Sequence, residues 1–569
     1  MPDSPRSLSK FWRELKRRKV VQVIIVYATV AFVLIELTNN IAEPLGLPER
    51  TNTLVIVLLV IGFPFTVILS WIFDVTRKGI KKTEAIDSVT KQAKDQSMDD
   101  SISRFTNSIV VLPFQDMSQE KDQDYFCDGI TEEIINALTH IESLKVIART
   151  SAFAFKNKYK DVRKIGQELN VETILEGSVR KAGNNLRITA QLIQVSDGAH
   201  IWSERYDRVI KDIFNIQDEI SLTIAEKLKI ELFDDERKQL LKSKTHNLEA
   251  YKLYLQGRYY WNKRTREGLT TSIEYFKNSI ETDPDYALAY IGLADAYIVL
   301  GDWGHMLPKD ACRNAKDIVL KALKIDKNLG EAYATLAYIS GFYEWNWKEA
   351  ENYFQRAFEL NQNYPTAHQW YALSCAILGQ VNRAHNHISQ AKELDPLSMV
   401  LNVANGIIYY LSHDFNKAIK QFQKALAINR NLGSVNFWLG IIYIQKRMYD
   451  EAVREFKNML SIDNQDSSYQ KYVSRVEDTY KKSGIEGVIS WLIDEGDSLD
   501  KDIYNRPYRQ AVYNTILGNK EKAMEWLEKA VEMKLSRIIA MSCDPVLDPL
   551  RNDPRFTKAL ERMGLVESL

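Results

Sequence analysis

The sequence predicts a multidomain protein with an N-terminal two-helix transmembrane hairpin, a small α+β domain and an all-α helical-repeat solenoid. Three observations predict this architecture. Two long apolar runs stand near the N-terminus, strand and helix patterns alternate in the next stretch, and the second half repeats every 34 residues. A chain of 569 residues has room for several domains, since one domain takes about 100–200 residues.

The first transmembrane helix is predicted over residues 20–38, which contain no Lys or Arg and one carboxylate, Glu36. The second is predicted over residues 54–73, which contain no charged residue. At about 1.5 Å per residue, each run matches the roughly 30 Å hydrocarbon core of a bilayer. A soluble helix of this length is rarely apolar on every face, so the alternative is an unusually apolar core hairpin. The second span favours a retained hairpin over a cleaved signal peptide.

Charges beside the two spans predict their orientation. Basic residues precede the first span and follow the second, whereas the loop between the spans carries only Arg50, beside Glu43 and Glu49. The positive-inside rule then places both chain ends in the cytoplasm and the loop outside, as a multi-pass membrane anchor. The basic start of the chain is also expected to contact anionic lipid headgroups. Residues 1–82 form this basic, membrane-anchored part, and the polar residues 83–106 are predicted to be a linker.

Residues 107–232 carry the pattern of a small α+β domain in the order β-α-β-α-β-β-β-α. Residues 108–114 and 144–150 read as buried strands, and each is followed by a helical pattern. Two alternating strands flank a Gly- and Asn-containing turn at 182–185, as expected of a hairpin. Within the first helix, Thr131 is a plausible N-cap, with Glu132 and Glu133 in the first turn.

Five segments of this domain resemble a known family. In order they are SIVVLPFQDMS, DYFCDGITEEI, LKVIARTSAFAFK, VETILEGSVRKAGNNLRITAQLI and GAHIWSERYD. Together they resemble the TolB amino-terminal-like domain, which is related to the FlgO-type domain, over about 100 of the 569 residues. The resemblance implies a non-catalytic protein-interaction domain. TolB itself continues into a periplasmic β-propeller, of which this sequence shows no repeat, so a periplasmic role is not transferred.

Residues 249–569 form a repeat array of about seven units with a C-terminal cap. Small residues and aromatic or aliphatic residues recur at intervals of 34 residues: Ala384, Ala418 and Ala452; Ala372, Gly406 and Gly440; Ile388, Phe422 and Phe456. This is the tetratricopeptide-repeat pattern of paired antiparallel helices. With the hairpin and the preceding domain, the array resembles a bacterial family of membrane-anchored TolB-like, tetratricopeptide-repeat proteins. In that grouping the same domain also accompanies cyclase or winged-helix modules.

Tetratricopeptide arrays offer a concave face that is lined by the first helix of each pair. Three consecutive repeats place a mostly apolar stripe there, and its candidate peptide-binding residues are Gln369, Leu373, Val403, Ile407, Tyr410, Phe437, Ile441 and Ile444. An apolar stripe of this extent indicates a covered surface. Two interpretations stay open: an apolar peptide or helix of a partner binds the groove, or the groove packs on another part of this chain.

No catalytic motif is present, since the sequence lacks a P-loop, GxGxxG, GxSxG and HExxH. The four cysteines are far apart and form no zinc spacing, and Asp128 with Gly129 is a weak nucleotide-site candidate. The balance of 75 basic and 75 acidic residues argues against a nucleic-acid binder. We therefore expect no enzyme activity, no cofactor, no metal and no small-molecule substrate.

The expected function is that of an inner-membrane-anchored scaffold or adaptor, with unidentified protein partners and membrane lipid as its contacts. The alternative is a regulatory or signalling subunit linked to a nucleotide cyclase or a transcription system.

Overall fold

The structure is a computed structural model that describes residues 107–566, except 159, 234–235, 238–239, 241–244, 462–467 and 496–505. In the N-terminal part it describes two short strands and a few isolated helical residues. The chain divides into a unit of residues 1–102 and a unit of residues 103–569. Each unit is therefore described by itself.

In the N-terminal unit, β1 (Phe73–Thr76) and β2 (Gly79–Lys82) form an antiparallel hairpin. The hydroxyl of Tyr27 donates to the carbonyl of Leu59 at 2.7 Å, and the Tyr27 ring centre lies 5.6 Å from that of Phe63. These residues of the two predicted spans therefore contact each other. Of spans 20–38 and 54–73, the structure describes Tyr27, Ala31, Thr38, Val55, Leu59, Gly62, Phe63 and the β1 residue Phe73; the other residues of the spans and the linker 83–106 lie outside the described residues. Among the residues that are described, no helix is both long and apolar enough to cross a membrane.

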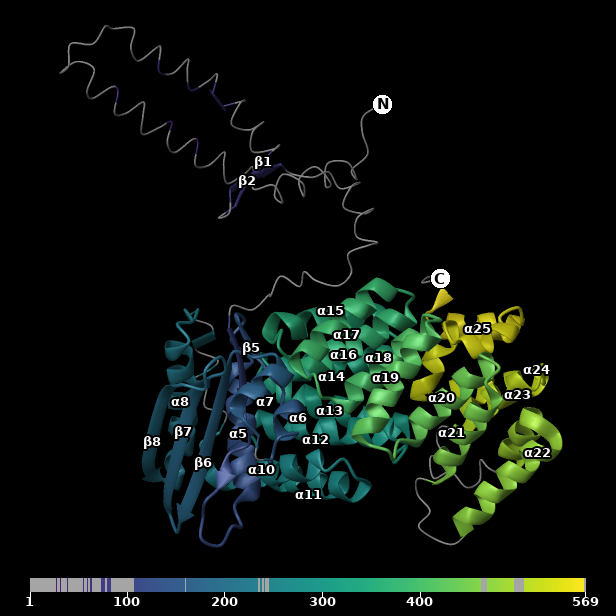
Figure 1. Cartoon of the computed structure of the whole chain (residues 1–569), viewed down its shortest axis with the longest axis horizontal. Coiled ribbons are helices and arrows are strands. Elements are labelled where there is room, and N and C mark those ends of the chain that lie inside the picture. Colours follow the sequence, from purple (N-terminus) through teal and green to yellow (C-terminus); the bar gives the residue numbers. More distant parts are fainter. Residues whose placement is uncertain are drawn as a thin grey trace. The chain divides into compact units, whose positions relative to one another are not determined.

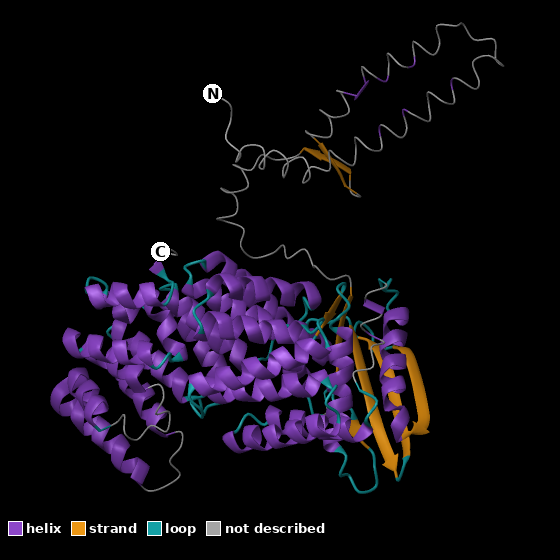
Figure 2. Ribbon diagram, turned by 180° about the vertical axis from the view of Figure 1, so that it is seen from behind, coloured by secondary structure: helices purple, strands orange, loops and turns teal. Residues whose placement is uncertain are grey.

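The second unit begins with a small α/β domain, whose elements follow the predicted order (Figures 1 and 2). They are β3 (Asn107–Val111), β4 (Gln115–Asp116), α5 (Asp124–Leu138), β5 (Leu144–Val146), α6 (Arg149–Phe153), α7 (Val162–Leu169), β6 (Thr173–Ala182), β7 (Asn185–Gln194), β8 (His200–Val209) and α8 (Ile213–Lys227). The sheet order is β5-β3-β6-β7-β8, and β4 pairs with β6.

This sheet is parallel at one end and antiparallel at the other. β3 runs parallel to β5 and β6, and the apolar residues of β3 are fully buried, as expected where helices cover a parallel sheet. β6 and β7 pair along their whole length from Thr173↔Gln194 to Ala182↔Asn185. Gly183 supplies a positive φ of 58° in the turn that joins them. The edge strand β8 is largely exposed.

The first helix of the domain begins seven residues before the predicted N-cap. α5 starts at Asp124, so Thr131 lies inside the helix, where its hydroxyl donates to the Cys127 carbonyl at 2.8 Å and accepts from the Phe114 amide at 3.0 Å. The threonine ties the helix to the sheet instead of capping a terminus. As a consequence, Glu132 and Glu133 lie within the helix and are buried.

The helical array consists of seven antiparallel pairs and one irregular element in the part of the chain that is described. The pairs are α10 (Leu248–Asn262) with α11 (Arg266–Thr282), α12 (Ala287–Asp302) with α13 (Pro308–Ile325), α14 (Gly330–Tyr338) with α15 (Trp347–Leu360), α16 (Pro365–Ile377) with α17 (Val381–Leu394), α18 (Met399–Leu411) with α19 (Phe415–Ile428), α20 (Gly433–Gln445) with α21 (Tyr449–Ser461), and α23 (Arg506–Ile516) with α24 (Lys520–Glu532). The irregular α22 (Ser468–Asp494) is broken at Gly484.

Small and aromatic residues meet inside each helix pair, which explains the 34-residue pattern. A Cβ atom added at Gly406 would lie 2.6 Å from the Phe422 ring, and one at Gly440 would lie 2.6 Å from the Phe456 ring. Both rings are fully buried. Only a residue without a side chain lets the first helix approach the second this closely.

Replacing Gly406 by Val is therefore expected to overpack the fifth helix pair and to lower the free energy of unfolding by about 1–3 kcal/mol. Urea denaturation followed by circular dichroism measures the change. Lys424→Val, at an exposed position of the neighbouring α19, is the control and is expected to change stability by less than about 0.5 kcal/mol. Equal effects of the two substitutions would contradict the packing argument.

The third pair has one residue more between Ala337 and Ala350 than the fourth has between Ala372 and Ala384, and a π-helical turn accommodates it. Residues Ile339–Tyr343 (η2) continue α14 with this wider turn, and Trp345 then adopts a φ of 64°. The aromatic side chains of this turn contact the C-terminal segment described below.

The α/β domain and the first repeat share one hydrophobic core. Tyr251, Tyr254 and Leu255 of α10 are buried together with the apolar residues of the sheet and α5. A Cβ atom at Gly129 of α5 would lie 2.6 Å from Leu255, so this glycine permits the close approach of α5 and α10. The two predicted modules therefore form one continuous body.

Candidate functional site

The α/β domain contacts the first repeat through α10 and later repeats through the turn before α16 and the turn after α17. The Asn363 amide nitrogen, in the turn before α16, donates to the carbonyls of Thr139, Ile141 and Leu144, each at 3.1 Å. The amide of Ala148 donates to the Leu394 carbonyl at 2.8 Å. These bonds join backbone of the α/β domain to two successive repeats, so they fix its position on the array.

A second connection joins Ser151 of α6 to Asp395, which follows α17. The Ser151 amide and hydroxyl donate to the same carboxylate oxygen at 3.0 and 2.5 Å. Asp395 is only 5% exposed. Burial raises the pKa of Asp395 to about 6, although the hydrogen bonds from Ser151 oppose this shift.

This pKa predicts a pH-dependent stability. Because the folded value lies above the ordinary 3.8, the stabilisation is complete below about pH 4 and is lost as the pH rises through about 6. We expect Asp395 alone to lower the free energy of unfolding by about 1–1.5 kcal/mol between pH 5 and 7.5, since part of its contribution is already lost at pH 5. Chemical denaturation at both pH values measures it. Asp395→Asn should reduce the difference, whereas the exposed control Asp207→Asn should not.

Between the two domains lies a buried cluster of charges centred on Glu132 of α5. Its carboxylate accepts from the Arg258 Nε at 2.7 Å, lies 2.9 Å from the Arg149 Nε, and accepts from the Asn262 amide at 3.3 Å. The Glu132 side chain is 6% exposed. Burial favours its neutral form, but the charges of Arg258 and Arg149 outweigh burial and lower the pKa of Glu132. The carboxylate is therefore ionised in the folded protein.

Arg258 also faces Asp295 of α12, with its Nη1 3.6 Å from the carboxylate. Burial raises the pKa of Asp295 to about 6, and the charges of Arg258 and Arg264 only partly offset it. Burial is the largest single influence on the pKa of Arg258, but the charge and hydrogen bond of Glu132, together with Tyr254 and Asp295, outweigh it and raise the pKa above its ordinary value. Glu132 is therefore the main counter-charge of Arg258.

These residues line a cavity of about 320 Å³ between the α/β domain and the repeats. Its wall combines charged groups from α5, α6, α10 and α12 with the apolar side chains of Tyr254, Leu288 and Ile291. Arg264, in the turn after α10, lies with its guanidinium 3.6 Å above the Trp261 ring. The cavity has the size and mixed wall of a small-molecule site.

The sequence-predicted groove residues divide into two groups. Gln369, Leu373, Val403, Ile407 and Ile444 are half-buried. The other three, Tyr410, Phe437 and Ile441, are fully buried. The structure therefore does not leave these three on an open surface.

A segment of the same chain covers the buried group. After α24 the chain forms η5 (Ser536–Ser542), η6 (Pro545–Leu550) and α25 (Pro554–Arg562). The Tyr410 hydroxyl donates to Asp544 at 2.5 Å, and the Tyr508 hydroxyl donates to the other oxygen of that carboxylate. The Ser542 hydroxyl donates to the Ile377 carbonyl at 3.2 Å. These contacts favour the interpretation that the stripe packs on another part of this chain.

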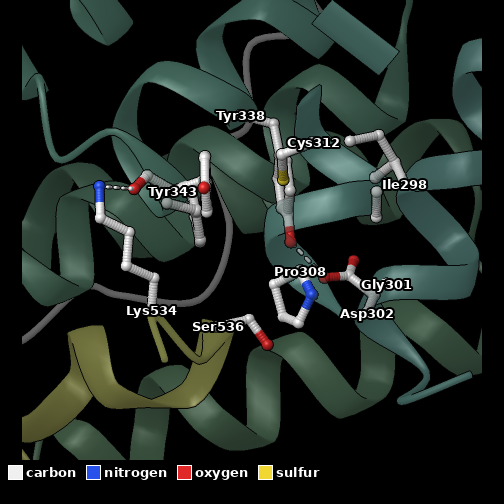
Figure 3. Close-up of a pocket in the computed structure, with 11 residues that line it drawn as sticks. Ile298, Gly301, Asp302, Pro308, Cys312, Tyr338, Tyr343, Lys534 and Ser536 are labelled. Carbon is white, nitrogen blue, oxygen red and sulfur yellow. Dashed lines mark hydrogen bonds between the residues drawn. The ribbon is translucent and has the colours of Figure 1, made fainter. Parts of the chain in front are cut away.

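The C-terminal segment also reaches the third repeat (Figure 3). Lys534 extends toward η2 and donates to the Tyr343 carbonyl at 3.2 Å. Beside it, the Tyr338 hydroxyl donates to Asp302, whose pKa burial raises to about 6. The Trp347 indole donates to the Met563 carbonyl at 2.8 Å. The α/β domain thus contacts the first repeats, and the C-terminal segment contacts the middle repeats.

The weak nucleotide-site candidate has a structural role here. Asp128 lies inside α5 and pairs with Lys156 at 2.7 Å, and Gly129 packs on α10. Within the described ranges, no group of three or more His, Cys, Asp or Glu side chains is arranged to hold a metal ion. Cys127, Cys312 and Cys375 are buried free thiols.

Comparisons with known families divide the chain in the same way. Residues 105–223 match the family model of the second domain of HilA/YgeH-like transcriptional regulators. Residues 409–476 and 508–536 match two tetratricopeptide-repeat models.

Two curated relatives are similar to parts of the chain. Putative adenylate cyclase 3 of Rhizobium meliloti is 38% identical over 232 residues, which cover 40% of this chain and 39% of that protein. The transcriptional regulator HilA of Salmonella typhimurium is 20% identical over 319 residues, or 55% of this chain and 56% of HilA. The chain thus spans less than two thirds of either relative.

Solved structures overlap with the repeats only loosely. Pseudomonas aeruginosa pilF is 17% identical, with a TM-score of 0.28 over 44% of this chain and 92% of that one. Yeast Tom70 is 18% identical, with a TM-score of 0.34 over 55% of this chain and 67% of that one. The repeat assignment therefore depends on the family models and on the helix pairs. The chain is a multidomain protein with a small α/β domain and a tetratricopeptide-repeat region.

Proposed function

We propose that this chain is a membrane-anchored interaction scaffold that presents its α/β domain and its repeats in the cytoplasm. The observation that carries the proposal is that the repeats bind two other parts of the same chain. They do so through Asn363 and Asp395 at one place and through Tyr410 at another. A surface that binds polypeptide through backbone carbonyls and buried side chains suits an adaptor.

The buried residues of the predicted groove limit where a partner can bind. Because Tyr410, Phe437 and Ile441 are already covered, a partner has to use another surface or displace the C-terminal segment. The half-buried residues Val403 and Ile407 are the part of the stripe that a partner would reach first.

A second candidate function is regulation of a linked output, and the relatives favour it. Parts of this chain are similar to a putative adenylate cyclase and to a transcriptional regulator, two proteins with different outputs. A region shared between different outputs suits a regulatory module better than a catalytic one. In this candidate the α/β domain and repeats control an output domain or a partner, without catalysing its reaction.

Cross-linking in the native membrane tests the scaffold. A photo-reactive amino acid at Val403 is expected to yield specific cross-linked products, whereas the same amino acid at the exposed Lys424 serves as control. Equal yields at the two positions, or no product at either, would argue against a scaffold that uses this face. Turnover of ATP by the purified chain, abolished by Asp128→Asn, would contradict the non-enzymatic role.

A reporter fusion tests the topology separately. A reporter that is active only in the periplasm, fused after Gln96, is expected to be inactive, and a cytoplasmic reporter at the same position is expected to be active. The reverse pattern would reject the cytoplasmic placement, and it would leave the proposed interactions of the repeats untested.

A further inference from the structure

Three arginines converge on the cavity between the α/β domain and the repeats. Arg149 comes from α6, Arg258 from α10, and Arg264 from the turn that follows α10. Glu132 pairs with two of them, Arg149 at 2.9 Å and Arg258 at 2.7 Å. A single carboxylate therefore serves two guanidinium groups, and the cationic side of the cavity is not neutralised by it alone.

Arg264 is the least compensated of the three. Among the described residues, Arg264 forms no ion pair with a carboxylate within 4 Å. Its guanidinium carbon lies 3.6 Å from the centre of the Trp261 ring. Burial is the main cause that lowers the pKa of Arg264 to about 10; the charge of Arg258 acts in the same direction, and the charge of Asp295 opposes it. Charges withdrawn from water are normally paired, so this guanidinium lacks the counter-ion that such a position calls for.

Two polar atoms in the same wall also lack a partner. The Trp261 Nε1 and the Asn363 Oδ1 are buried without a hydrogen bond, and the Asn363 residue is 1% exposed. Asn363 uses its amide nitrogen to hold the α/β domain, which leaves its oxygen free to accept. An unpaired buried donor or acceptor is unfavourable, so a ligand that satisfied both would be stabilised.

We propose that this cavity binds a small organic anion. Its carboxylate or phosphate group lies on the Arg264 guanidinium and accepts from the Trp261 Nε1, a hydrogen-bond donor elsewhere on the ligand meets the Asn363 Oδ1, and its body packs on Tyr254, Leu288 and Ile291. Charge-assisted bonds from arginine suit both anionic groups.

The remaining charges set the limits of the ligand. Asp285, Asp295, Asp326, Glu331 and Asp395 also line the cavity, so a polyanion would be repelled, and a ligand with one or two negative charges has to place them at the arginine side. Because both domains form the wall, an occupant would strengthen their association. The ligand would in this way act on the docking of the α/β domain, which goes beyond a scaffold role.

Calorimetric titration of the full chain tests the proposal, with inorganic phosphate and succinate as probes at a constant ionic strength kept with sodium chloride. We expect saturable binding of at least one probe, and the probe that binds identifies the anionic group. Arg264→Met should weaken binding about tenfold. Arg313→Met, whose side chain is 64% exposed and pairs with Asp310, is the matched control and should bind like the wild type.

A second variant separates binding from folding. Trp261→Phe keeps an aromatic ring under Arg264 but removes the Nε1 donor together with part of the indole ring, so binding should weaken about threefold to tenfold. Trp303→Phe, at a 38% exposed position, is its control. The proposal is overturned if neither probe saturates on the wild-type chain, or if Arg264→Met and Trp261→Phe bind as tightly as their controls.

Discussion

Replacing Glu132 by Gln is expected to destabilise the body formed by the α/β domain and the repeats by about 3–5 kcal/mol. The substitution keeps the shape of the side chain but removes the charge that Arg149 and Arg258 share. Two guanidinium groups would then remain withdrawn from water without their main counter-charge. The loss should exceed that of a surface ion pair, because the Glu132 side chain is 6% exposed.

Urea denaturation of wild type and variant at pH 7 measures this effect. Asp207→Asn is the matched control, since Asp207 pairs with Arg187 while both side chains are nearly half exposed, and its loss should stay below about 1 kcal/mol. The variant should also separate the two domains, which limited proteolysis in the segment between α8 and α10 would detect. A Glu132→Gln protein as stable as the control would mean that the cluster contributes no net stabilisation.

Local patterns explain why much of the fold could be predicted. The repeat period follows from a steric rule inside each pair, where Gly406 must lie against Phe422 and Gly440 against Phe456. Both members of a contact of this kind are present in the sequence at a fixed spacing. The β6–β7 hairpin is predictable for the same reason, because its alternation and its turn at Gly183 are contiguous.

The charge cluster could not be predicted, because its members are distant in sequence. Glu132 and Arg258 are 126 residues apart, and each stands in an ordinary amphipathic helix where a charge indicates a solvated face. The prediction of a helix start at Thr131 is wrong for a related reason. A threonine before two glutamates is typical of a helix start, but here its hydroxyl accepts from the amide of Phe114, which lies between β3 and β4. A weak signal was present in α10, where Arg258 and Asn262 lie four residues apart on one face.

The groove illustrates a different limit. Its apolar character was evident from Tyr410, Phe437 and Ile441, and the sequence left open whether a partner or the chain itself covers them. The choice depends on Asp544, which lies 134 residues after Tyr410 and carries no apolar pattern of its own. Only the folded arrangement brings this carboxylate between the hydroxyls of Tyr410 and Tyr508.

Ending the chain at Met533 is expected to open this stripe and to lower the free energy of unfolding by more than about 3 kcal/mol. The removed segment buries Ile538, Met541 and Leu547 completely against the repeats. Without it, the Tyr410 hydroxyl loses Asp544 and the apolar stripe becomes accessible to solvent. Exposed patches of this kind promote association, so the shortened protein should bind an apolar dye and self-associate.

Dye fluorescence and light scattering after gel filtration measure these two consequences, with a chain ending at Val566 as the control that keeps η5, η6 and α25. The point variant Asp544→Ala should lie between the two, since it removes only the acceptor shared by Tyr410 and Tyr508. A shortened protein that stays monomeric and binds no more dye than the control would show that the segment does not shield the stripe. A stepwise increase in dye binding from the chain ending at Val566, through Asp544→Ala, to the chain ending at Met533 would instead show that this one segment shields the stripe.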